Sequence, residues 1–227
     1  MRPFEIILLT LLGVSAIQIL FSAREKNQTK LLMKFIFPVL LIHLFLEQYR
    51  WQMFPAYVSI IMLIFLQKKS IHSIIKFLFF IWVGLSVSLP AVIPIIKMPD
   101  LTGPYTIGSS IHHWVDESRM EWFTDEDPDD MRQIMVQFWY PAEKVKKVKR
   151  TPYVDHINTR TKSIGIAGGF PGFLVRHIEL TKTNSYLDLE VDPAPAPFPI
   201  IIFSHGITSM RYLHTSFAEK LANHGYA

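Results

Sequence analysis

The segment Pro199–Ala227, PIIIFSHGITSMRYLHTSFAEKLANHGYA, decides how the C-terminal half of this chain is interpreted. It begins with a continuous apolar run, Ile200–Phe203, which predicts a strand buried on both faces of a mostly parallel sheet. Apolar residues then recur at every fourth position of an amphipathic helix, at Leu213, Phe217 and Leu221. Gly225 is a natural residue to end that helix. The segment therefore predicts a strand-turn-helix unit of an α/β domain.

The turn between this strand and helix, Ser204–Thr208, reads SHGIT. A turn at this place can direct backbone N–H groups at a carbonyl oxygen that becomes negative during acyl transfer. Gly206 suits a tight turn and lets an ester approach the backbone closely. The G-x-S-x-G motif that would present a nucleophilic serine is absent from the 227 residues. Because that motif follows such a loop along the chain, we expect the nucleophile beyond Ala227.

Composition separates the chain into two parts. Hydrophobic residues make up 50% of it and the mean hydropathy is +0.25, which is too apolar for a purely soluble protein. Residues 1–100 carry ten Lys/Arg and four Asp/Glu, whereas residues 101–227 carry thirteen and fifteen. The excess of cations thus lies in the apolar part, where it marks membrane orientation and gives no support for nucleic-acid binding. The absence of cysteine excludes disulfides, thiolate catalysis and cysteine-based zinc sites.

Four apolar stretches bounded by charge fill the first hundred residues: Ile6–Ala23, Leu31–Leu46, Phe54–Leu66 and Ile71–Ile96. A membrane span needs about 20 mostly apolar residues. With flanking residues, the stretches predict four spans at about 6–23, 31–48, 51–67 and 71–96. Three spans is the alternative, and a cleaved signal peptide would explain only the first stretch.

The orientation of these spans follows from their flanking cations. Lysine and arginine cluster beside the first and third connections, at Arg24, Lys26, Lys30, Lys34, Lys68, Lys69 and Lys76. The other ends carry only Arg2, Arg50 and Lys97. Because cytoplasmic loops hold the excess of cations, the first and third connections should be cytoplasmic. With four spans, the N-terminus and the region after Lys97 would then lie outside the cytoplasm.

Two ionisable residues, His43 and Glu47, fall near the end of the second stretch. Ionisable groups inside spans are functional hypotheses by default. These two lie four positions apart on one helical face. The preferred interpretation is an interfacial pair that faces lipid headgroups.

The remainder of the chain has the composition of a soluble domain. Thr106–Val115 and Arg132–Tyr140 predict strands, the second ending at Pro141, which cannot continue a ladder. The acidic loop between them lacks the glycine and the final glutamate of a calcium loop. His112 and His113 would face opposite sides of a strand and cannot hold one ion together. No metal site is predicted.

Two further runs receive structural interpretations. Five cations within Lys144–Arg150 predict a solvated loop, with contact to anionic headgroups as the sharper alternative. The glycines at 165, 168, 169 and 172 lack the G-x-G-x-x-G order of a dinucleotide site and predict a flexible loop. No cofactor is expected.

The C-terminal region resembles the plasma-type platelet-activating-factor acetylhydrolases and their bacterial, membrane-anchored relatives. The resemblance extends from about residue 98 to the end and rests on motifs in order: TGPYTIG (102–108), HWVDESR (113–119), MVQFWYPAE (135–143), FSHGITSMR (203–211) and LANHGY (221–226). It implies an α/β-hydrolase fold and calcium-independent hydrolysis of an ester, typically the short or oxidised sn-2 acyl group of a phospholipid. It also implies that Ile207, after the His-Gly pair, donates its backbone N–H to the oxyanion hole formed with the Gly206 loop.

The predicted architecture is therefore an N-terminal transmembrane bundle of about four spans, residues 1–97, followed by the N-terminal portion of an α/β-hydrolase domain, residues 98–227, on the exoplasmic side. The Ser, Asp and His of the triad would lie beyond Ala227, so the chain as given is expected to be inactive. The expected partners are the bilayer and a phospholipid or other lipid ester.

Three residues of the C-terminal segment are expected to be structural. Ser204 lacks the flanking glycines of a nucleophile, and His205 and His214 precede the catalytic base in the family's order. Two other functions stay open. The first is a non-catalytic membrane protein whose soluble part is an interaction or sensing module, and the second is an esterase for small soluble esters.

Overall fold

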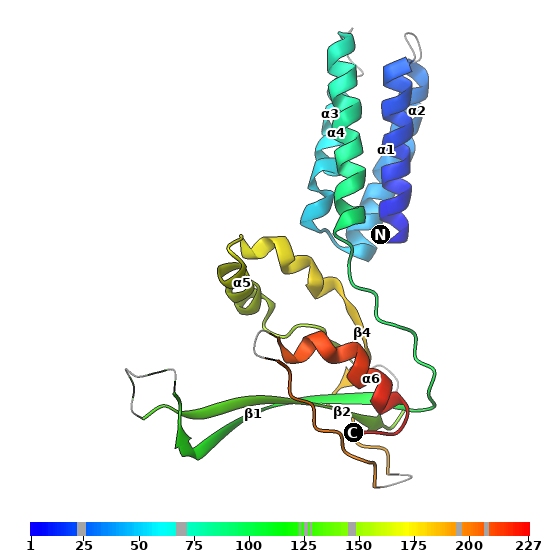
Figure 1. Cartoon of the computed structure of the whole chain (residues 1–227). Helices are drawn as coiled ribbons and strands as arrows, with labels where there is room; N and C mark the ends of the chain where they lie inside the picture. The colour runs from blue at the N-terminus through cyan, green and yellow to red at the C-terminus, as the bar shows by residue number, and fades with distance from the viewer. Residues whose placement is uncertain are drawn as a thin grey trace. The chain divides into compact units, whose positions relative to one another are not determined.

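The computed structural model of the chain divides into two compact units (Figure 1). The helical unit comprises Met1–Ile95 and Gly165–His177. The sheet unit comprises Ile96–Ile164 and Ile178–Ala227. The structure describes residues 1–21, 26–66, 72–122, 124, 127, 129–144, 149–193, 197–206 and 209–227, with the side chains of 26–29 left aside.

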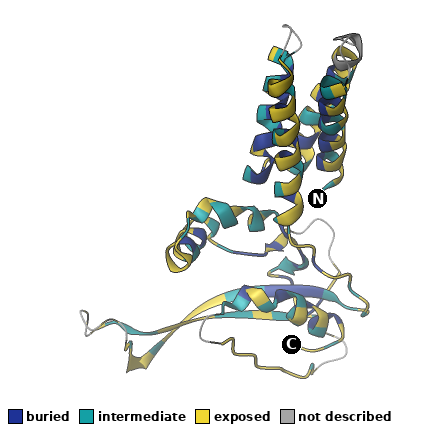
Figure 2. Cartoon of the chain, turned by 45° about the horizontal axis from the view of Figure 1, so that its top comes forward, coloured by how far each residue is buried: buried dark blue, intermediate teal, exposed yellow. Residues whose placement is uncertain are grey.

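The helical unit contains α-helices that lie side by side: α1 (Pro3–Phe21), α2 (Lys26–Ile42), α3 (Phe54–Leu66) and α4 (Ser73–Val92). α2 continues into a π-helical turn, η1 (His43–Glu47), and the 3-10 turn η2 (Trp51–Met53) leads into α3. Large apolar side chains on the facing sides are fully buried, among them Leu8, Leu12, Leu63 and Phe79. The outer sides are exposed and largely apolar (Figure 2).

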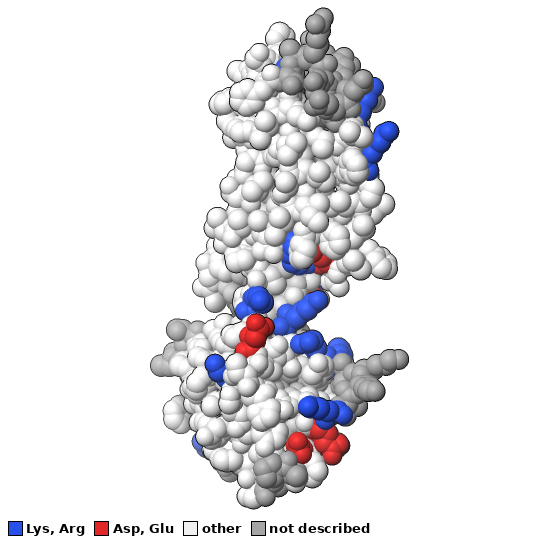
Figure 3. All heavy atoms as spheres, turned by 90° about the vertical axis from the view of Figure 1, so that its right-hand side faces the viewer, with Lys and Arg blue, Asp and Glu red and all other residues white. Residues whose placement is uncertain are grey.

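Two of these helices, α1 and α4, are long and apolar enough to cross a membrane, judged by length and composition alone. η2 and α3 together form a shorter apolar helix. The face of this unit shown in Figure 3 is largely uncharged along its length. Four spans stay a prediction. Three of the cations that set the orientation, Arg24, Lys68 and Lys69, lie outside the described residues.

The sheet unit is built on a four-stranded mixed sheet in the order β2-β1-β4-β3. β1 (Thr106–Met120) and β2 (Met131–Ala142) form a long antiparallel hairpin. β4 (Lys182–Leu187) pairs in parallel with β1 and antiparallel with β3 (Arg150–Pro152). The two strands predicted from the sequence are confirmed as β1 and β2, and both are longer than predicted.

Pro141 does not end β2 as predicted, because it pairs with Ile107 and the strand continues to Ala142. A proline has no N–H to donate, but its carbonyl can still accept. Pro141 O accepts from Asp192 N at 3.0 Å, and Ala142 forms an antiparallel bridge with Val191. The ladder therefore continues past the missing donor because the chain after β4 supplies a partner at the edge of β2.

The predicted flexible glycine loop is instead occupied by α5 (Ile157–Gly168) and η3 (Gly172–Leu180). Gly165 and Gly168 lie inside α5, so the loop prediction is wrong at these positions. A Cβ atom at Gly165 would collide with the Phe170 carbonyl oxygen, and one at Gly168 with the Phe170 ring. These glycines allow the chain to return closely over the end of the helix.

Two predicted loops lie partly outside the described residues: Asp125 and Glu126 of the acidic loop, and residues 145–148 of the basic run. Arg150, the last cation of the basic run, opens β3 instead of lying in a solvated loop. Its guanidinium lies 5.4 Å from the centroid of the Tyr186 ring and donates to Thr183 O. This arginine therefore links β3 to β4 through its side chain.

Candidate functional site

The segment Ile200–Phe203 is extended but exposed, so the prediction of a strand buried on both faces is wrong for this structure. Ile201 N donates to Ala227 O at 2.7 Å, and Ala227 N donates to Pro199 O at 2.9 Å. The segment thus pairs with the residues that follow the last helix. Ile202 is 93% exposed. No strand among the described residues covers its faces, which is why its apolar side chains are open.

The turn after this segment is closed by a hydrogen bond from Ser209 N to Gly206 O, at 2.9 Å. Ile207, the predicted oxyanion donor, lies outside the described residues, as does Thr208. Among the described residues, a Cβ atom at Gly206 would meet nothing within 4 Å. These residues therefore leave the space above Gly206 open, as the approach of an ester to this backbone requires. The role of Ile207 and Gly206 stays a prediction.

The helix after the turn, η4 (Arg211–His214) with α6 (Thr215–Asn223), buries its polar side instead of its apolar one. Leu213 and Phe217 of the predicted core face are 53% and 55% exposed. The buried residues of α6 are Thr215, Glu219, Ala222 and Asn223. Gly225 has φ 93° two residues after the helix, as predicted for a glycine that ends it.

Glu219 explains why the polar side of α6 faces the sheet. Its fully buried Oε1 accepts from Asn184 N, Ser185 N and Ser185 Oγ at 2.8, 2.9 and 2.8 Å. Burial raises the pKa of this carboxyl, and the hydrogen bonds from Ser185 and Asn184 offset only part of that rise. The contacts join α6 to β4. Sequence reasoning missed Glu219 because its partners lie 34 and 35 positions away.

Two of the quoted motifs, TGPYTIG and LANHGY, meet at the end of α6. Gly103 N donates to Asn223 Oδ1, Asn223 Nδ2 donates to Tyr105 O, and Tyr105 N donates to Asn223 O. A Cβ atom at Gly103 would collide with the Asn223 carbonyl. The glycine is therefore needed for this approach of two backbones. The contact places the end of α6 beside the start of β1.

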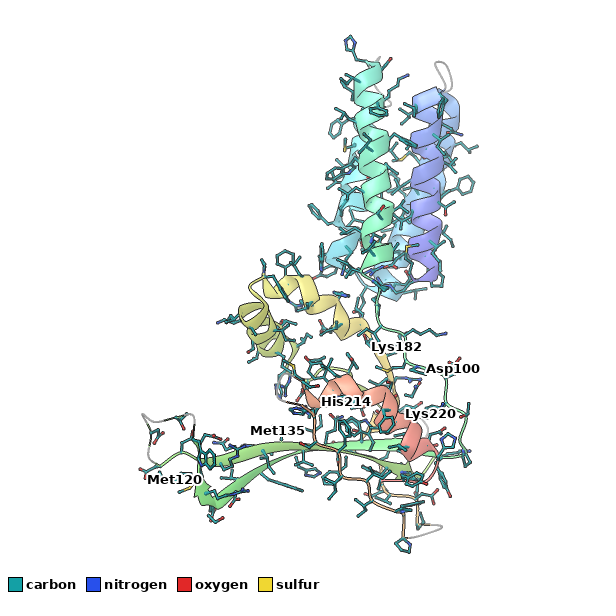
Figure 4. The ribbon with its side chains drawn as sticks, viewed as in Figure 1. Asp100, Met120, Met135, Lys182, His214 and Lys220 are labelled. Atoms are coloured by element: carbon teal, nitrogen blue, oxygen red, sulfur yellow. The ribbon has the colours of Figure 1, made fainter. Side chains whose placement is uncertain are left out.

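A cavity of about 580 Å³ lies between the β1–β2 hairpin, the segment Ile200–His205, and η4 with α6. Its walls are mainly apolar, and Figure 4 labels two of the lining residues, Met135 on β2 and His214 at the end of η4. Phe203 packs against His214 and Phe217 with ring centroids 4.5 and 6.4 Å apart. The volume is in the range typical of small-molecule sites.

One lining residue, Arg211, belongs to a charged cluster. Arg211 Nη2 lies 2.6 Å from Asp155 Oδ2, while Arg160 donates to both Asp155 carboxylate oxygens at 2.7 and 3.2 Å. Burial opposes ionisation of Asp155, but the hydrogen bonds from Arg160 and the charge of Arg211 hold its pKa below the ordinary value. Arg211 follows the predicted oxyanion turn by three residues. Its position in FSHGITSMR is the signal that could have identified it.

His205 and His214 of the predicted turn and helix have partners nearby in the sequence. His205 Nδ1 lies 3.0 Å from Gly206 O, and His214 Nε2 lies 3.3 Å from Ser209 Oγ. Ser204 and His205 both line the cavity. His112 and His113 of β1 have separate partners, Ser110 and Gln133.

His43 and Glu47 are buried inside the helical unit, so their interpretation as an outward-facing interfacial pair is wrong. The side chain of His43 is 0% exposed and that of Glu47 is 9% exposed. His43 Nδ1 lies 2.9 Å from Glu47 Oε2, and its Nε2 lies 2.8 Å from Tyr57 Oη. Partners on α3 and α1 cover them, since Glu47 Oε1 also accepts from Phe4 N at 3.0 Å.

A second buried pair in this unit joins Glu5 of α1 to Arg50. Arg50 Nε and Nη2 donate to the two Glu5 oxygens at 2.7 and 2.9 Å. The remaining donors of Arg50 reach backbone carbonyls at the end of α4, Ile93 O at 2.8 Å and Pro90 O at 3.2 Å. Arg2 also pairs with Glu5 at 2.9 Å. A carboxylate thus lies between two arginines.

A mixed sheet with α6 packed against it, and an apolar cavity lined by the extended segment Ile200–His205, define an α/β-hydrolase-like domain. The sequence model described as "Platelet-activating factor acetylhydrolase, isoform II" matches residues 91–227. The chain belongs to this family. The resemblance inferred from its motifs is thereby confirmed.

Two further proteins are similar to this chain over part of their length. A protein of Schizosaccharomyces pombe described as "Putative phospholipase A2" is 28% identical over 142 residues, which cover 57% of this chain and 31% of that protein. The solved structure of a ferulic acid esterase from Streptomyces cinnamoneus is 24% identical with a TM-score of 0.43, over 57% of this chain and 34% of that one. The chain thus spans about a third of the length of each relative.

Proposed function

We propose that the complete protein is a membrane-anchored serine esterase that hydrolyses a lipid ester, in the first place the short or oxidised sn-2 acyl ester of a phospholipid. The observation that carries this proposal is the apolar cavity of about 580 Å³, which is lined by Ser204 and His205 of the predicted oxyanion loop. Apolar walls suit an acyl chain, and membership of the family supports ester hydrolysis.

In this proposal the chemistry is serine acyl transfer. A histidine takes the proton of a serine hydroxyl as the serine oxygen attacks the ester carbon, and it then protonates the departing alcohol. The Ile207 N–H, on the loop that Gly206 opens, donates to the oxygen that becomes negative. The Ser, Asp and His are supplied by residues beyond Ala227. Residues 1–227 alone are expected to be inactive.

The anchor in this proposal is residues 1–97, with four spans and the hydrolase domain, 98–227, on the exoplasmic side. The length and apolarity of α1 and α4 support at least part of that anchor. The exposed apolar outer sides of the helical unit suit lipid surroundings. An active site tethered beside a bilayer favours a lipid ester over a soluble one.

The proposal is tested by assaying an extended reading frame and residues 1–227 side by side. We expect the extended protein to hydrolyse a short-chain p-nitrophenyl ester and, more efficiently, a phosphatidylcholine with a short or oxidised sn-2 chain. Residues 1–227 should hydrolyse neither. Equal hydrolysis by residues 1–227 would contradict the placement of the triad. A reporter fused after Met98 tests the topology, and a cytoplasmic signal would contradict the exoplasmic assignment.

A further inference from the structure

In the charged cluster beside the cavity, two arginines pair with one carboxylate, and the described residues supply no second one. The carboxylate of Asp155 is shared between Arg160 and Arg211, with shortest distances of 2.7 and 2.6 Å. All three side chains are largely buried, at 12%, 29% and 13% exposed in the order Asp155, Arg160 and Arg211. A guanidinium remains charged at any pH at which a protein is folded. Two cations therefore share one anion.

Arg160 makes more hydrogen bonds to Asp155 than Arg211 does. It donates to both oxygens of Asp155 and also to its backbone carbonyl, at 3.1 Å. Arg211 contacts one oxygen of the same carboxylate. Within the described part of the chain, nothing accepts from Arg211 Nε, although the atom is buried. Nε itself is closed off from solvent, so a ligand in the cavity can reach this side chain only through its exposed part, which is 13% of its surface.

Arg211 also brings the only Lys, Arg, Asp or Glu side chain to the wall of the cavity, among the described residues that line it. The rest of the wall consists of aromatic and aliphatic side chains with a few neutral polar ones. A single cation in apolar surroundings interacts strongly with an anion, because the low dielectric screens the attraction weakly. Such a site suits a molecule that is apolar over most of its length and carries one negative charge.

We propose that Arg211 binds the phosphate group of the substrate in this cavity, with Asp155 as the residue that positions its guanidinium. Planar guanidinium groups match the oxygens of a phosphate and can bind two of them at once. Because Arg211 lines the same cavity as Ser204 and His205, a phosphate held by Arg211 would share that cavity with the described part of the predicted oxyanion loop. This role of Arg211 rests on the proposed ester hydrolysis. In it, the guanidinium of Arg211 is the group that selects a phospholipid over a neutral ester.

The test uses the extended, full-length protein and two substrates with the same sn-2 acyl chain: a soluble short-chain phosphatidylcholine and an uncharged diacylglycerol. Arg211→Gln should raise KM for the phosphatidylcholine about 10- to 100-fold, as expected for loss of a charge-assisted hydrogen bond, and should change KM for the diacylglycerol less than about 2-fold. Arg211→Lys, which keeps the charge, should retain part of the preference. Asp155→Asn should also raise the KM for the phosphatidylcholine relative to the KM for the diacylglycerol, but by a smaller factor than Arg211→Gln.

Controls separate this role from a structural one. Arg119→Gln removes an exposed arginine that pairs with Asp116 outside the cavity, and it should leave both substrates unaffected. Inorganic phosphate should inhibit the wild type competitively and Arg211→Gln more weakly, which distinguishes a site for free phosphate from one that needs the whole lipid. Equal losses on both substrates, or no loss on either, would overturn the proposal.

A binding measurement keeps the inference separate from the proposed function. If the full-length wild type hydrolyses neither substrate, the proposed function fails. Binding of a non-hydrolysable diether phosphatidylcholine, followed by tryptophan fluorescence because Trp114 lines the cavity, then decides the inference. Weaker binding by Arg211→Gln, with unchanged binding of an uncharged diether lipid, would support it, and equal binding by both proteins would overturn it.

Discussion

The helical unit and the sheet unit each hold a buried carboxylate between two arginines, Glu5 in the first and Asp155 in the second. In the helical unit all three nitrogens of Arg50 have acceptors, two on Glu5 and the others on backbone carbonyls of Pro90 and Ile93. In the sheet unit, Arg211 Nε has none among the described residues. The donors of the first cluster are satisfied within the protein, whereas the second cluster includes an arginine that lines a cavity.

This difference separates a stabilising cluster from a binding one. A buried ion pair whose donors are all satisfied joins elements that are distant in sequence, here α1, the start of η2 and the end of α4. An arginine at the wall of a cavity can instead contact a ligand bound there. Changes in the helical cluster should therefore alter stability, and changes near the cavity should alter catalysis.

The largest expected effect is on the helical cluster. Glu5→Ala leaves Arg50 buried without its carboxylate, and removal of one partner of such a pair typically costs about 3–5 kcal/mol. Unfolding of the full chain in detergent micelles, followed by circular dichroism, measures the loss. The double variant Glu5→Met with Arg50→Met removes both charges and should lose far less. A double variant as unstable as Glu5→Ala would show that the charges do not determine stability here.

The second effect concerns the predicted oxyanion donor. Ile207→Pro removes the backbone N–H, and loss of one such donor typically lowers kcat about 100- to 1,000-fold, or about 2.7–4 kcal/mol. Ile207→Leu keeps the N–H and serves as the control. Both variants of the full-length protein should unfold at the temperature of the wild type. Full activity of Ile207→Pro would remove Ile207 from the proposed mechanism.

A third effect tests the contact between α6 and β4. Glu219→Ala leaves the donors of Asn184 and Ser185 buried without an acceptor, which should reduce the free energy of unfolding by about 1–3 kcal/mol. Glu219→Gln keeps a carbonyl oxygen in place of Oε1 and should retain most of the stability at neutral pH. Denaturant unfolding of the three proteins makes the comparison. If alanine and glutamine are equivalent, the hydrogen bonds do not hold the helix.

The smallest effect is the pH dependence of stability, in which the two carboxyls of the sheet unit should act with opposite sign. The pKa of Glu219 is raised by burial above its ordinary value of 4.5, so its contribution to stability is present below pH 4.5 and is lost as pH rises through the raised value. Burial also opposes ionisation of Asp155, but Arg160 and Arg211 lower its pKa below 3.8. Its contribution is therefore present above pH 3.8 and is lost as pH falls through the lowered value.

Single variants separate the two contributions. Glu219→Gln should flatten the decline in unfolding free energy above pH 4.5, and Asp155→Asn should flatten the loss below pH 3.8. Measurements of unfolding against pH on the wild type and both variants check this. If both variants changed the slope of unfolding free energy against pH in the same pH range, the assignment of the two ranges to Glu219 and Asp155 would be contradicted.

Local patterns in the sequence predicted those features that depend on neighbouring residues. Residues of high strand propensity predicted β1 and β2, and Gly225 predicted the end of α6, because strand propensity and helix ends are determined within a few residues. The inward side of α6 could not be predicted from periodicity, which favoured Phe217 over Glu219. The partners of Glu219 lie on β4, 34 and 35 residues earlier, and the Glu5–Arg50 pair spans 45 residues. Contacts between residues so far apart in the sequence depend on the topology of the fold, which local patterns do not specify.

The contact of Asn223 with Gly103 and Tyr105 has a consequence for biosynthesis. The hydrogen bonds join residues 120 and 118 positions apart, so the segment that leads into β1 cannot obtain its native partners until the ribosome has released the chain beyond Asn223. Contacts of such long separation form late in folding. Until that time the start of the sheet is held by its hairpin and by β4, without the contacts from the end of α6. Incompletely packed intermediates of this kind are the species that chaperones protect from aggregation.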